Sequence, residues 1–280
     1  MKHIVYLLKI IISNFLLIIS KIKNKKGLII LEYHRISNDI EYNDVHSIYP
    51  HEFYFQVNYL IKAGYEIVDL RDGINDLFSN NLKNRKAISL TFDDGHKDNI
   101  LYAYPILKEF NISATMFIVS DYVGKKGWLD ETGNLINYNK KNSQRWELLS
   151  WDELDIIKDH FNIESHSKSH KYLNKVTNNE LYSEIIDPKA KITETLKKNV
   201  SIFCYPYGAF NSEVINSVKT FGYKAACSTE KGINNNKTDI YKLKRNEVGR
   251  GISKTQFCLL LSDAICSYDV ISTLFNKIKK

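Results

Sequence analysis

The sequence contains few cysteines, and none of them has the spacing of a structural zinc site. Four occur among the 280 residues, well separated from one another and mostly within apolar runs: Cys204, Cys227, Cys258 and Cys266. Cysteines in such surroundings are typically buried free thiols, so the pattern fits a reducing compartment.

Internal repeats and the features of a nucleic-acid-binding protein are also missing. The sequence has no arginine cluster and no pattern of stacking aromatic residues, so we expect no nucleic-acid partner. The formal net charge of +7 suits an anionic membrane surface or a phosphate-bearing glycolipid. Lysine, asparagine and isoleucine are frequent throughout the chain, however, so the charge alone does not identify a partner or an oligomer.

Apolar runs typical of strands recur along the chain with helical stretches between them, and this alternation predicts a parallel sheet. The expected strands are Gly27–Tyr33, Tyr65–Asp69, Ala87–Phe92, Ala114–Val119, Phe161–Ser165, Ser201–Tyr205, Tyr223–Cys227 and Ile240–Leu243. A hydrophobic content of 44% is enough to fill one core. We therefore expect a single α/β catalytic domain over residues 27–280, in the form of a barrel.

Two adjacent carboxylates, Asp93 and Asp94, stand where the apolar strand Ala87–Leu90 runs into a turn at Gly95. Because successive side chains of a strand point to opposite sides, these aspartates can serve different partners, such as a metal ion and the water beside it. An ordinary helix cap or Asx-turn is the alternative, since most Asp-Asp-Gly triplets are of that kind.

Two histidines four residues apart, His166 and His170, follow the short apolar stretch Phe161–Ile163. One helical turn at that spacing would place both rings on one face, within reach of one ion. Two surface histidines in a polar loop are the alternative. Together with a carboxylate and a position left for water, two neutral imidazoles make the ligand set of a hydrolytic zinc site.

A third motif, Phe203–Gly208, completes a combination that resembles the polysaccharide deacetylase family, carbohydrate esterase family 4, with its NodB-homology domain. Weaker likeness at Leu31–Ile36, Leu149–Leu154 and Tyr241–Arg245 extends the resemblance over most of the chain. The pair Tyr33–His34 looks like the N-terminal Tyr-His pair of the poly-N-acetylglucosamine deacetylase branch. The resemblance implies a distorted (β/α)7 barrel, whose active site lies at the trailing ends of the strands.

The resemblance also implies a role for each matching residue. Asp94, His166 and His170 would hold a divalent metal, most often zinc in this family, and Asp93 would be the general base that takes a proton from the attacking water. The metal and the backbone N–H of Tyr207 would stabilise the oxyanion. The complete substrate-binding motif is Tyr205, Pro206, Tyr207 and Gly208. An ordinary β-turn is the alternative for this motif.

The sequence departs from the family pattern at the acid and near the base. No histidine follows His170, whereas many members carry the catalytic acid on a late histidine. His34, at the end of the run Leu28–Leu31, is the replacement candidate for protonating the leaving amine, and a core histidine bonded to a backbone carbonyl is the alternative. An arginine that other members place before the proline motif is also missing, so Arg245 becomes the candidate for orienting the base. Glu164 stands where the family commonly has glycine.

Residues 1–26 form a separate segment, nearly continuous in apolar residues from Ile4 to Ile22 and followed by a run of lysines. We expect a membrane-associated helix, either lying in the cytoplasmic leaflet or crossing the bacterial inner membrane with the catalytic domain inside. A secretory signal with an exported domain and a soluble core helix are the alternatives, although no small-residue cleavage site follows.

The sequence thus indicates a metal-dependent deacetylase that removes acetyl groups from N-acetylated sugars of a bacterial polysaccharide, a glycolipid or a lipid-linked intermediate. Two other classes remain open. One is a catalytically inactive carbohydrate-binding or scaffold protein on the same barrel, suggested by the missing late histidine. The other is a metal hydrolase acting on another amide.

Overall fold

The computed structural model describes residues 27–40, 44–82, 85–127, 146–262, 264, 265 and 267. The expected apolar helix of residues 1–26 and Cys266 lie outside this part of the chain. Over the described ranges, no helix has the length and apolar character needed to cross a membrane.

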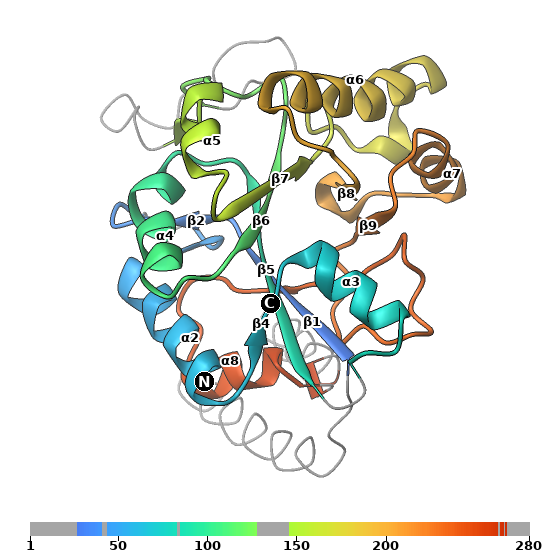
Figure 1. Cartoon of the computed structure of the whole chain (residues 1–280). Helices are drawn as coiled ribbons and strands as arrows, with labels where there is room; N and C mark the ends of the chain where they lie inside the picture. The colour runs from blue at the N-terminus through green and yellow to red at the C-terminus, as the bar shows by residue number, and fades with distance from the viewer. Residues whose placement is uncertain are drawn as a thin grey trace, which may run out of the picture.

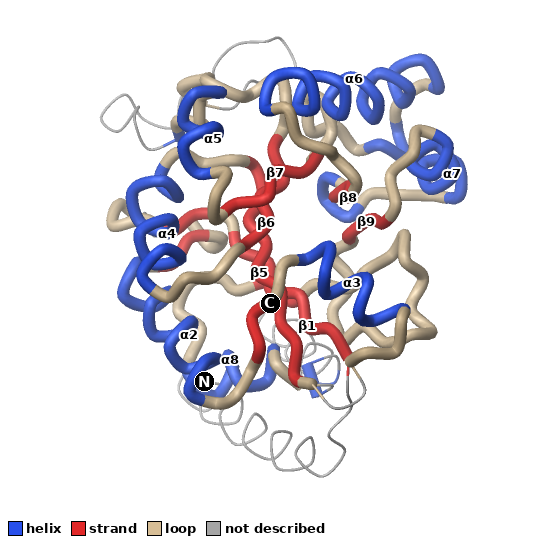
Figure 2. The backbone as a smooth tube through the Cα atoms, in the orientation of Figure 1, coloured by secondary structure: helices blue, strands red, loops and turns tan. Residues whose placement is uncertain are grey.

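A curled sheet of parallel strands occupies the centre of the molecule, with helices around it (Figures 1 and 2). Seven strands follow one another in the order β10-β1-β5-β6-β7-β8-β9, and β4 pairs with β5 beside this path. Their bounds are β1 Gly27–Tyr33, β4 Glu66–Ile67, β5 Lys86–Asp94, β6 Ala114–Ile118, β7 Phe161–Ser165, β8 Ile202–Cys204, β9 Ala225–Cys227 and β10 Asn246–Glu247. The predicted α/β barrel is confirmed.

Some of the helices that surround the sheet begin with a capping box. Ser150 and Thr177 each accept a hydrogen bond from the backbone three residues on, and Glu153 and Glu180 complete two capping boxes. The helices are α2 Pro50–Lys62, α3 Leu70–Phe78, α4 Asp98–Glu109, α5 Trp151–Ile157, α6 Asn178–Leu196, α7 Ser212–Thr220 and α8 Lys254–Leu260, with short 3₁₀ turns η2 Leu173–Lys175 and η3 Pro206–Gly208. A small parallel pair, β2 Arg35–Ile36 and β3 Ser47–Ile48, lies outside the main sheet.

The strands are buried on both faces, as expected for a parallel sheet covered by helices. Phe92 of β5 packs among aromatic rings on one face, 5.2 Å from Phe161 and 5.3 Å from Tyr33 between ring centroids. Asp93, the next residue, points to the opposite face by the alternation of a strand. The apolar anchor at Phe92 therefore turns Asp93 into the barrel.

The segment from Leu243 to Val248 closes the barrel and is called here the closing segment. Leu243 exchanges backbone hydrogen bonds with β9, through Ala226 and Ser228, at 2.9 and 2.8 Å. A few residues later, β10 pairs with β1 in the register Leu31↔Asn246. One short segment therefore joins the two ends of the seven-stranded path.

The predicted strand Ile240–Leu243 is wrong for all but its last residue. Asp239 accepts backbone hydrogen bonds from Tyr241 and Lys242, at 3.0 and 2.8 Å, and this folds the chain into a turn. Of these four residues, Leu243 forms a parallel bridge to Cys227, and the carbonyl of Ile240 accepts one hydrogen bond from the backbone N–H of Ala226 at 3.0 Å. The edge strand comes later at Asn246–Glu247.

Candidate active site

Four parallel strands bring the predicted site residues to one edge of the barrel. His34 follows β1, Asp93 and Asp94 end β5, His166 follows β7 and Tyr205 follows β8. Because these strands are parallel, their carboxyl ends face the same side, where barrels of this kind assemble their active sites. Motifs that are far apart in the sequence therefore lie together at this edge, which is called here the mouth of the barrel.

Asp94, His166 and His170 converge with the geometry of a metal site. The two Nε2 atoms are 3.2 Å apart, and Oδ1 of Asp94 lies 3.7 Å from that of His166 and 3.5 Å from that of His170. Ligands at zinc bond lengths in a tetrahedral arrangement are separated by about 3.3 Å. Oδ1 of Asp94 is buried without a hydrogen-bond partner, as expected for an oxygen that faces a cation. The three residues therefore fit a divalent metal.

A tight turn, and not the predicted turn of helix, brings the two histidines together. Residues 166–170 are irregular, and both Ser167 and His170 have positive φ angles, of 66° and 60°. The backbone N–H of His170 donates to Oγ of Ser167 at 3.0 Å, which stabilises this conformation. Asp94 also has a positive φ, of 75°. Non-glycine residues in this region are strained and gather at functional sites.

Further contacts orient the candidate ligands. Nδ1 of His166 lies 2.9 Å from the carbonyl oxygen of Cys204 and donates to it, which leaves Nε2 to face the ion. Nε2 of His96 lies 3.4 Å from Oδ2 of Asp94, the oxygen that faces away from the other two ligands. His96 was missed in the sequence, and its place directly after Gly95 was the signal that could have found it.

The protonation states of the candidate ligands suit a cation. Burial lowers the pKa of His170 to about 4, although the charge of Asp94 raises it. Burial raises the pKa of Asp94, but the contact with His96 and the charge of His170 outweigh it, so the pKa lies well below its usual value. Near neutral pH, the site therefore offers a neutral imidazole at His170 and a carboxylate at Asp94.

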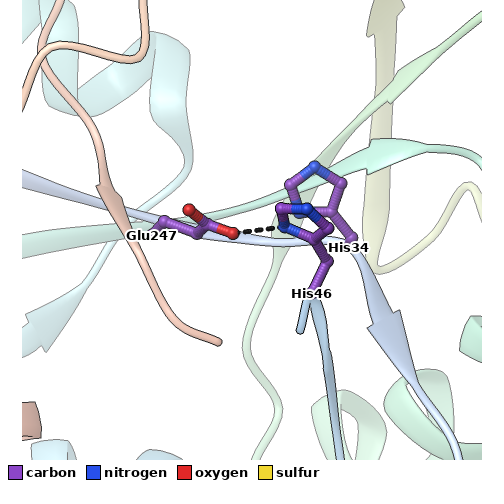
Figure 3. Close-up of side chains that lie close together, drawn as sticks. All are labelled: His34, His46 and Glu247. Atoms are coloured by element: carbon purple, nitrogen blue, oxygen red, sulfur yellow. Dashed lines mark hydrogen bonds and ion pairs between the residues drawn. The ribbon is translucent and has the colours of Figure 1, made fainter. Parts of the chain in front are cut away.

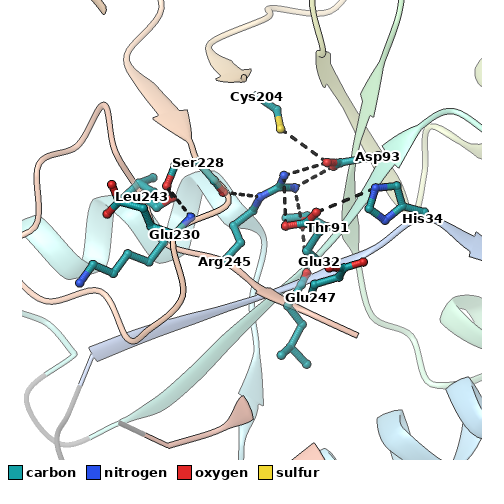
Figure 4. A network of polar contacts seen from close by, with 12 residues as sticks. Glu32, His34, Thr91, Asp93, Cys204, Ser228, Glu230, Leu243, Arg245 and Glu247 are labelled. Atoms are coloured by element: carbon teal, nitrogen blue, oxygen red, sulfur yellow. Dashed lines mark hydrogen bonds and ion pairs between the residues drawn. The ribbon is translucent and has the colours of Figure 1, made fainter. Parts of the chain in front are cut away.

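Arg245 holds Asp93 with a pair of parallel hydrogen bonds, both of 2.7 Å (Figure 4). The guanidinium is almost fully buried and also lies 3.3 Å from Oε2 of Glu32. Burial raises the pKa of Asp93, but the positive charge of Arg245 prevails and lowers it below its usual value. Burial raises the pKa of Glu32, against the same arginine. Glu32 is a second residue of the site that was missed in the sequence.

His34 lies beside this network (Figure 4), with Nε2 at 3.9 Å from Oε1 of Glu32. Its ligand atom is within 4.8 Å of those of Glu32 and Asp93. Nδ1 of His34 is buried without a hydrogen-bond partner, unlike a core histidine bonded to a carbonyl. Tyr33, in contrast, points into the core and donates its hydroxyl hydrogen to Gln56. Of the Tyr-His pair, only the histidine reaches the mouth.

The proline motif forms the 3₁₀ turn η3 at the edge of the candidate ligand set. Tyr207 has a φ of 58°, and its ring lies 4.5 Å from that of His170 and 4.0 Å from that of Tyr172, with which it is nearly parallel. Gly208 has a φ of 63°, and a Cβ there would lie 2.1 Å from Oγ1 of Thr229. Glycine is therefore required, and the turn holds Tyr207 against the candidate ligands.

Glu164 has a structural place away from the mouth. Its carboxylate accepts hydrogen bonds from the backbone N–H groups of Ser201 and Ile202, at 2.8 and 2.9 Å, and from Nε of Arg71 at 2.8 Å. The side chain thereby ties β7 to the start of β8 and to α3. A glycine could make none of these contacts.

Comparison with known proteins identifies the family. Residues 80–226, more than half of the chain, match the polysaccharide deacetylase family model. YxkH of Bacillus subtilis, a protein named after this family, is 28% identical over 238 residues, which cover 85% of this chain and 77% of YxkH. The poly-β-1,6-N-acetyl-D-glucosamine N-deacetylase of Staphylococcus aureus is 29% identical over 161 residues, 56% of this chain and 53% of that enzyme. The match thus spans about half the length of that relative.

A solved structure shares the fold. The deacetylase PplD of Streptococcus pyogenes, in complex with acetate, superposes with a TM-score of 0.71 at 22% identity, covering 84% of this chain and 98% of PplD. The barrel, the motifs at its mouth and these similarities agree. The chain belongs to the polysaccharide deacetylase family.

Proposed function

We propose that this protein is a divalent-metal-dependent N-deacetylase of an acetylated sugar, with Zn²⁺ as its metal. The observation that carries the proposal is the set of Asp94, His166 and His170, whose three ligand atoms lie 3.2–3.7 Å apart. Asp93, which Arg245 holds in one orientation, lies next to this set: its Oδ2 is 3.8 Å from Nε2 of His166. Two imidazoles and one carboxylate suit zinc and other ions of similar softness.

Asp94, His166 and His170 would hold a divalent metal, which would lower the pKa of a bound water to about 7 and polarise the acetyl carbonyl. Asp93 is the general base in this proposal, because its carboxylate is ionised and faces the same space. The two hydrogen bonds from Arg245 use one lone pair on each oxygen, and Oδ2 also accepts a weak hydrogen bond from Sγ of Cys204 at 3.6 Å. The second lone pair of Oδ1 is left to accept a proton. Arg245 therefore orients the base without blocking it.

His34 is the proposed general acid. Its ligand atom lies within 4.8 Å of that of Asp93. A protonated ring there can deliver a proton to the leaving amine as the C–N bond breaks. The turn from Tyr205 to Gly208 would close the site, with the backbone N–H of Tyr207 as a donor to the oxyanion.

The substrate class is proposed from the relatives. An N-acetylated sugar agrees with the Staphylococcus aureus enzyme, whose name states that it removes N-acetyl groups from poly-β-1,6-N-acetyl-D-glucosamine. We propose a related sugar in a polysaccharide, a glycolipid or a lipid-linked intermediate. The apolar residues Ile4–Ile22 and the lysines after them support attachment to the inner face of the bacterial inner membrane.

Two variants test the proposal on N-acetylated oligosaccharides, with amine release and metal content as the readouts. We expect Asp93→Asn to abolish turnover while the purified protein keeps its metal. His170→Ala should lose both metal and turnover, because the set then has two protein ligands. Sugar binding without turnover in the wild-type protein would instead identify an inactive binding protein, and release of another amine would identify a different amide as substrate.

A further inference from the structure

The mouth of the barrel holds more ligand atoms than one metal needs. Besides the proposed primary set, three further groups of side chains within the described part of the chain have ligand atoms within 4.8 Å of one another: Asp93 with His166 and Cys204, Glu32 with His34 and Asp93, and His34 with His46 and Glu247. Each group is a candidate for a second cation, so their electrostatic surroundings decide among them.

The positive charge of Arg245 disfavours cation binding at two of these three groups. Both contain Asp93, and the guanidinium is bonded to that carboxylate and lies against Glu32. A second cation there would meet a buried positive charge at close range. The group of His34, His46 and Glu247 contains none of the side chains that Arg245 binds.

The side chains of this third group face one another at the rim of the mouth (Figure 3). Nδ1 of His46 lies 2.5 Å from Oε1 of Glu247, and the ring of His34 lies 4.9 Å from that of His46. His34 brings a buried Nδ1 that has no hydrogen-bond partner. The side chains of His46 and Glu247 are 56% and 37% exposed, so an ion can reach them from solvent.

Backbone pairing fixes the positions of all three residues. The register Arg35↔Ser47 between β2 and β3 places His34 and His46 side by side, each one residue earlier. Glu247 pairs with Glu32 in the register of β10 and β1. The backbone N–H of Arg250 donates to the carbonyl of Val45 at 2.9 Å, which ties the chain beside His46 to the end of the closing segment.

We propose that His34, His46 and Glu247 form a second metal site, and that a borderline transition ion such as Zn²⁺ inhibits the enzyme there. Two imidazoles and a carboxylate make up the ligand set of several zinc enzymes, whereas Mg²⁺ and Ca²⁺ prefer oxygen ligands throughout. Binding displaces the proton shared by His46 and Glu247, which passes to the buffer.

An ion bound at this site prevents His34 from acting as the proposed general acid. A histidine that donates a proton to a leaving amine must first carry protons on both ring nitrogens, and an ion on either nitrogen prevents this. The inhibition therefore rests on the proposed function, through His34. Binding of the ion does not depend on the proposed function, because His46 and Glu247 take no part in the proposed reaction.

Binding is tested with the full-length protein by zinc titration against a competing chelator. We expect two ions in the wild-type protein and one in His46→Ala and in Glu247→Gln. His51→Ala, which removes an exposed histidine on α2, is the matched control and should still bind two. A second ion bound with unchanged affinity in both variants, or no second ion in the wild-type protein, would overturn the site.

Inhibition is tested by adding zinc beyond one equivalent during turnover. The wild-type enzyme should lose activity, and the midpoint should rise at least about ten-fold in His46→Ala, since loss of even an outer contact weakens metal sites by about 10–100-fold. Equal inhibition in this variant would refute the regulatory effect even if the ion binds. Absence of deacetylation under all conditions would refute the proposed function, and the binding titration would still decide the second site.

Discussion

Arg245 and Asp93, 152 positions apart in the sequence, are joined by two hydrogen bonds of 2.7 Å inside the barrel. Asp93 ends β5, whereas Arg245 lies on the closing segment, between its pairing with β9 and its pairing with β1. The same guanidinium also forms an ion pair with Glu32 at 3.3 Å. One cation therefore sets both the direction of the proposed base and the charge balance of the mouth.

Replacing Arg245 with lysine should separate orientation from charge. A single ammonium keeps the positive charge but cannot make two parallel bonds to a carboxylate, so Asp93 gains freedom to rotate. We expect kcat to fall about 100-fold, the cost of misplacing a catalytic group by about 1 Å. Steady-state kinetics should show this loss while the metal content stays at the wild-type value.

Replacing Arg245 with methionine should also destabilise the fold. Two buried carboxylates, Asp93 and Glu32, then lose their cation, and removing one partner of a buried ion pair costs about 3–5 kcal/mol. Urea unfolding at neutral pH measures the difference. Arg85→Met is the control, because it breaks ion pairs with Glu66 and Asp76 at the surface and should change the midpoint little. Equal effects of the two changes would contradict this account of Arg245.

His96→Ala should weaken metal binding without touching a ligand. His96 contacts the outer oxygen of Asp94, and loss of such a partner typically lowers metal affinity about 10–100-fold. Competition with a chelator measures the affinity. His160→Ala serves as the control, since that ring bonds to the carbonyl of Ile112 away from the mouth. An unchanged metal affinity in His96→Ala would show that the contact with His96 is not needed to hold Asp94 in place for metal binding.

The metal-free protein should lose stability as the pH falls from about 6.5 to 4. Burial lowers the pKa of His170 from 6.5 to about 4, so between these values the unfolded chain binds a proton that the folded chain does not. The free energy of unfolding therefore rises with pH from about 4 to 6.5, and the contribution of His170 is complete above pH 6.5. The contribution of His170 is at most about 3 kcal/mol.

Urea unfolding in the presence of a chelator, at pH 7 and at pH 5, measures this dependence. His170→Asn removes the titrating group, so its stability should fall less between the two pH values. A wild-type protein and a variant with parallel pH profiles would show that His170 does not titrate between its folded and unfolded values.

Much of the fold could be predicted because the longer parallel strands are runs rich in apolar residues. Phe161–Ser165 was predicted with its observed bounds, and Gly27–Tyr33 likewise. The motif residues Asp93, Asp94 and His166 could be placed at one mouth for the same reason, since each stands where such a run ends.

Contacts between distant segments could not be predicted from local pattern. Glu32 reads as an ordinary strand residue, and only the fold shows it facing Arg245. The turn at His166–His170 depends on positive φ angles at residues that rarely adopt them, so helical spacing gave the wrong geometry for a pair that nevertheless converges. The structural role of Glu164 depends on contacts with Arg71 and with the start of β8, which only the fold brings next to it.

The closing segment also governs the order in which the protein becomes competent during synthesis. β1 leaves the ribosome among the earliest described residues. Asn234 pairs with Leu28 at the start of this strand, but Leu31 and Glu32 gain their neighbours on the outer edge only when Asn246 and Glu247 have been made. Arg245 arrives with the same few residues. A nascent chain that stops before them therefore carries every candidate metal ligand of the primary set, but it lacks the pairing at Leu31 and Glu32 and the two hydrogen bonds that orient Asp93, the proposed base.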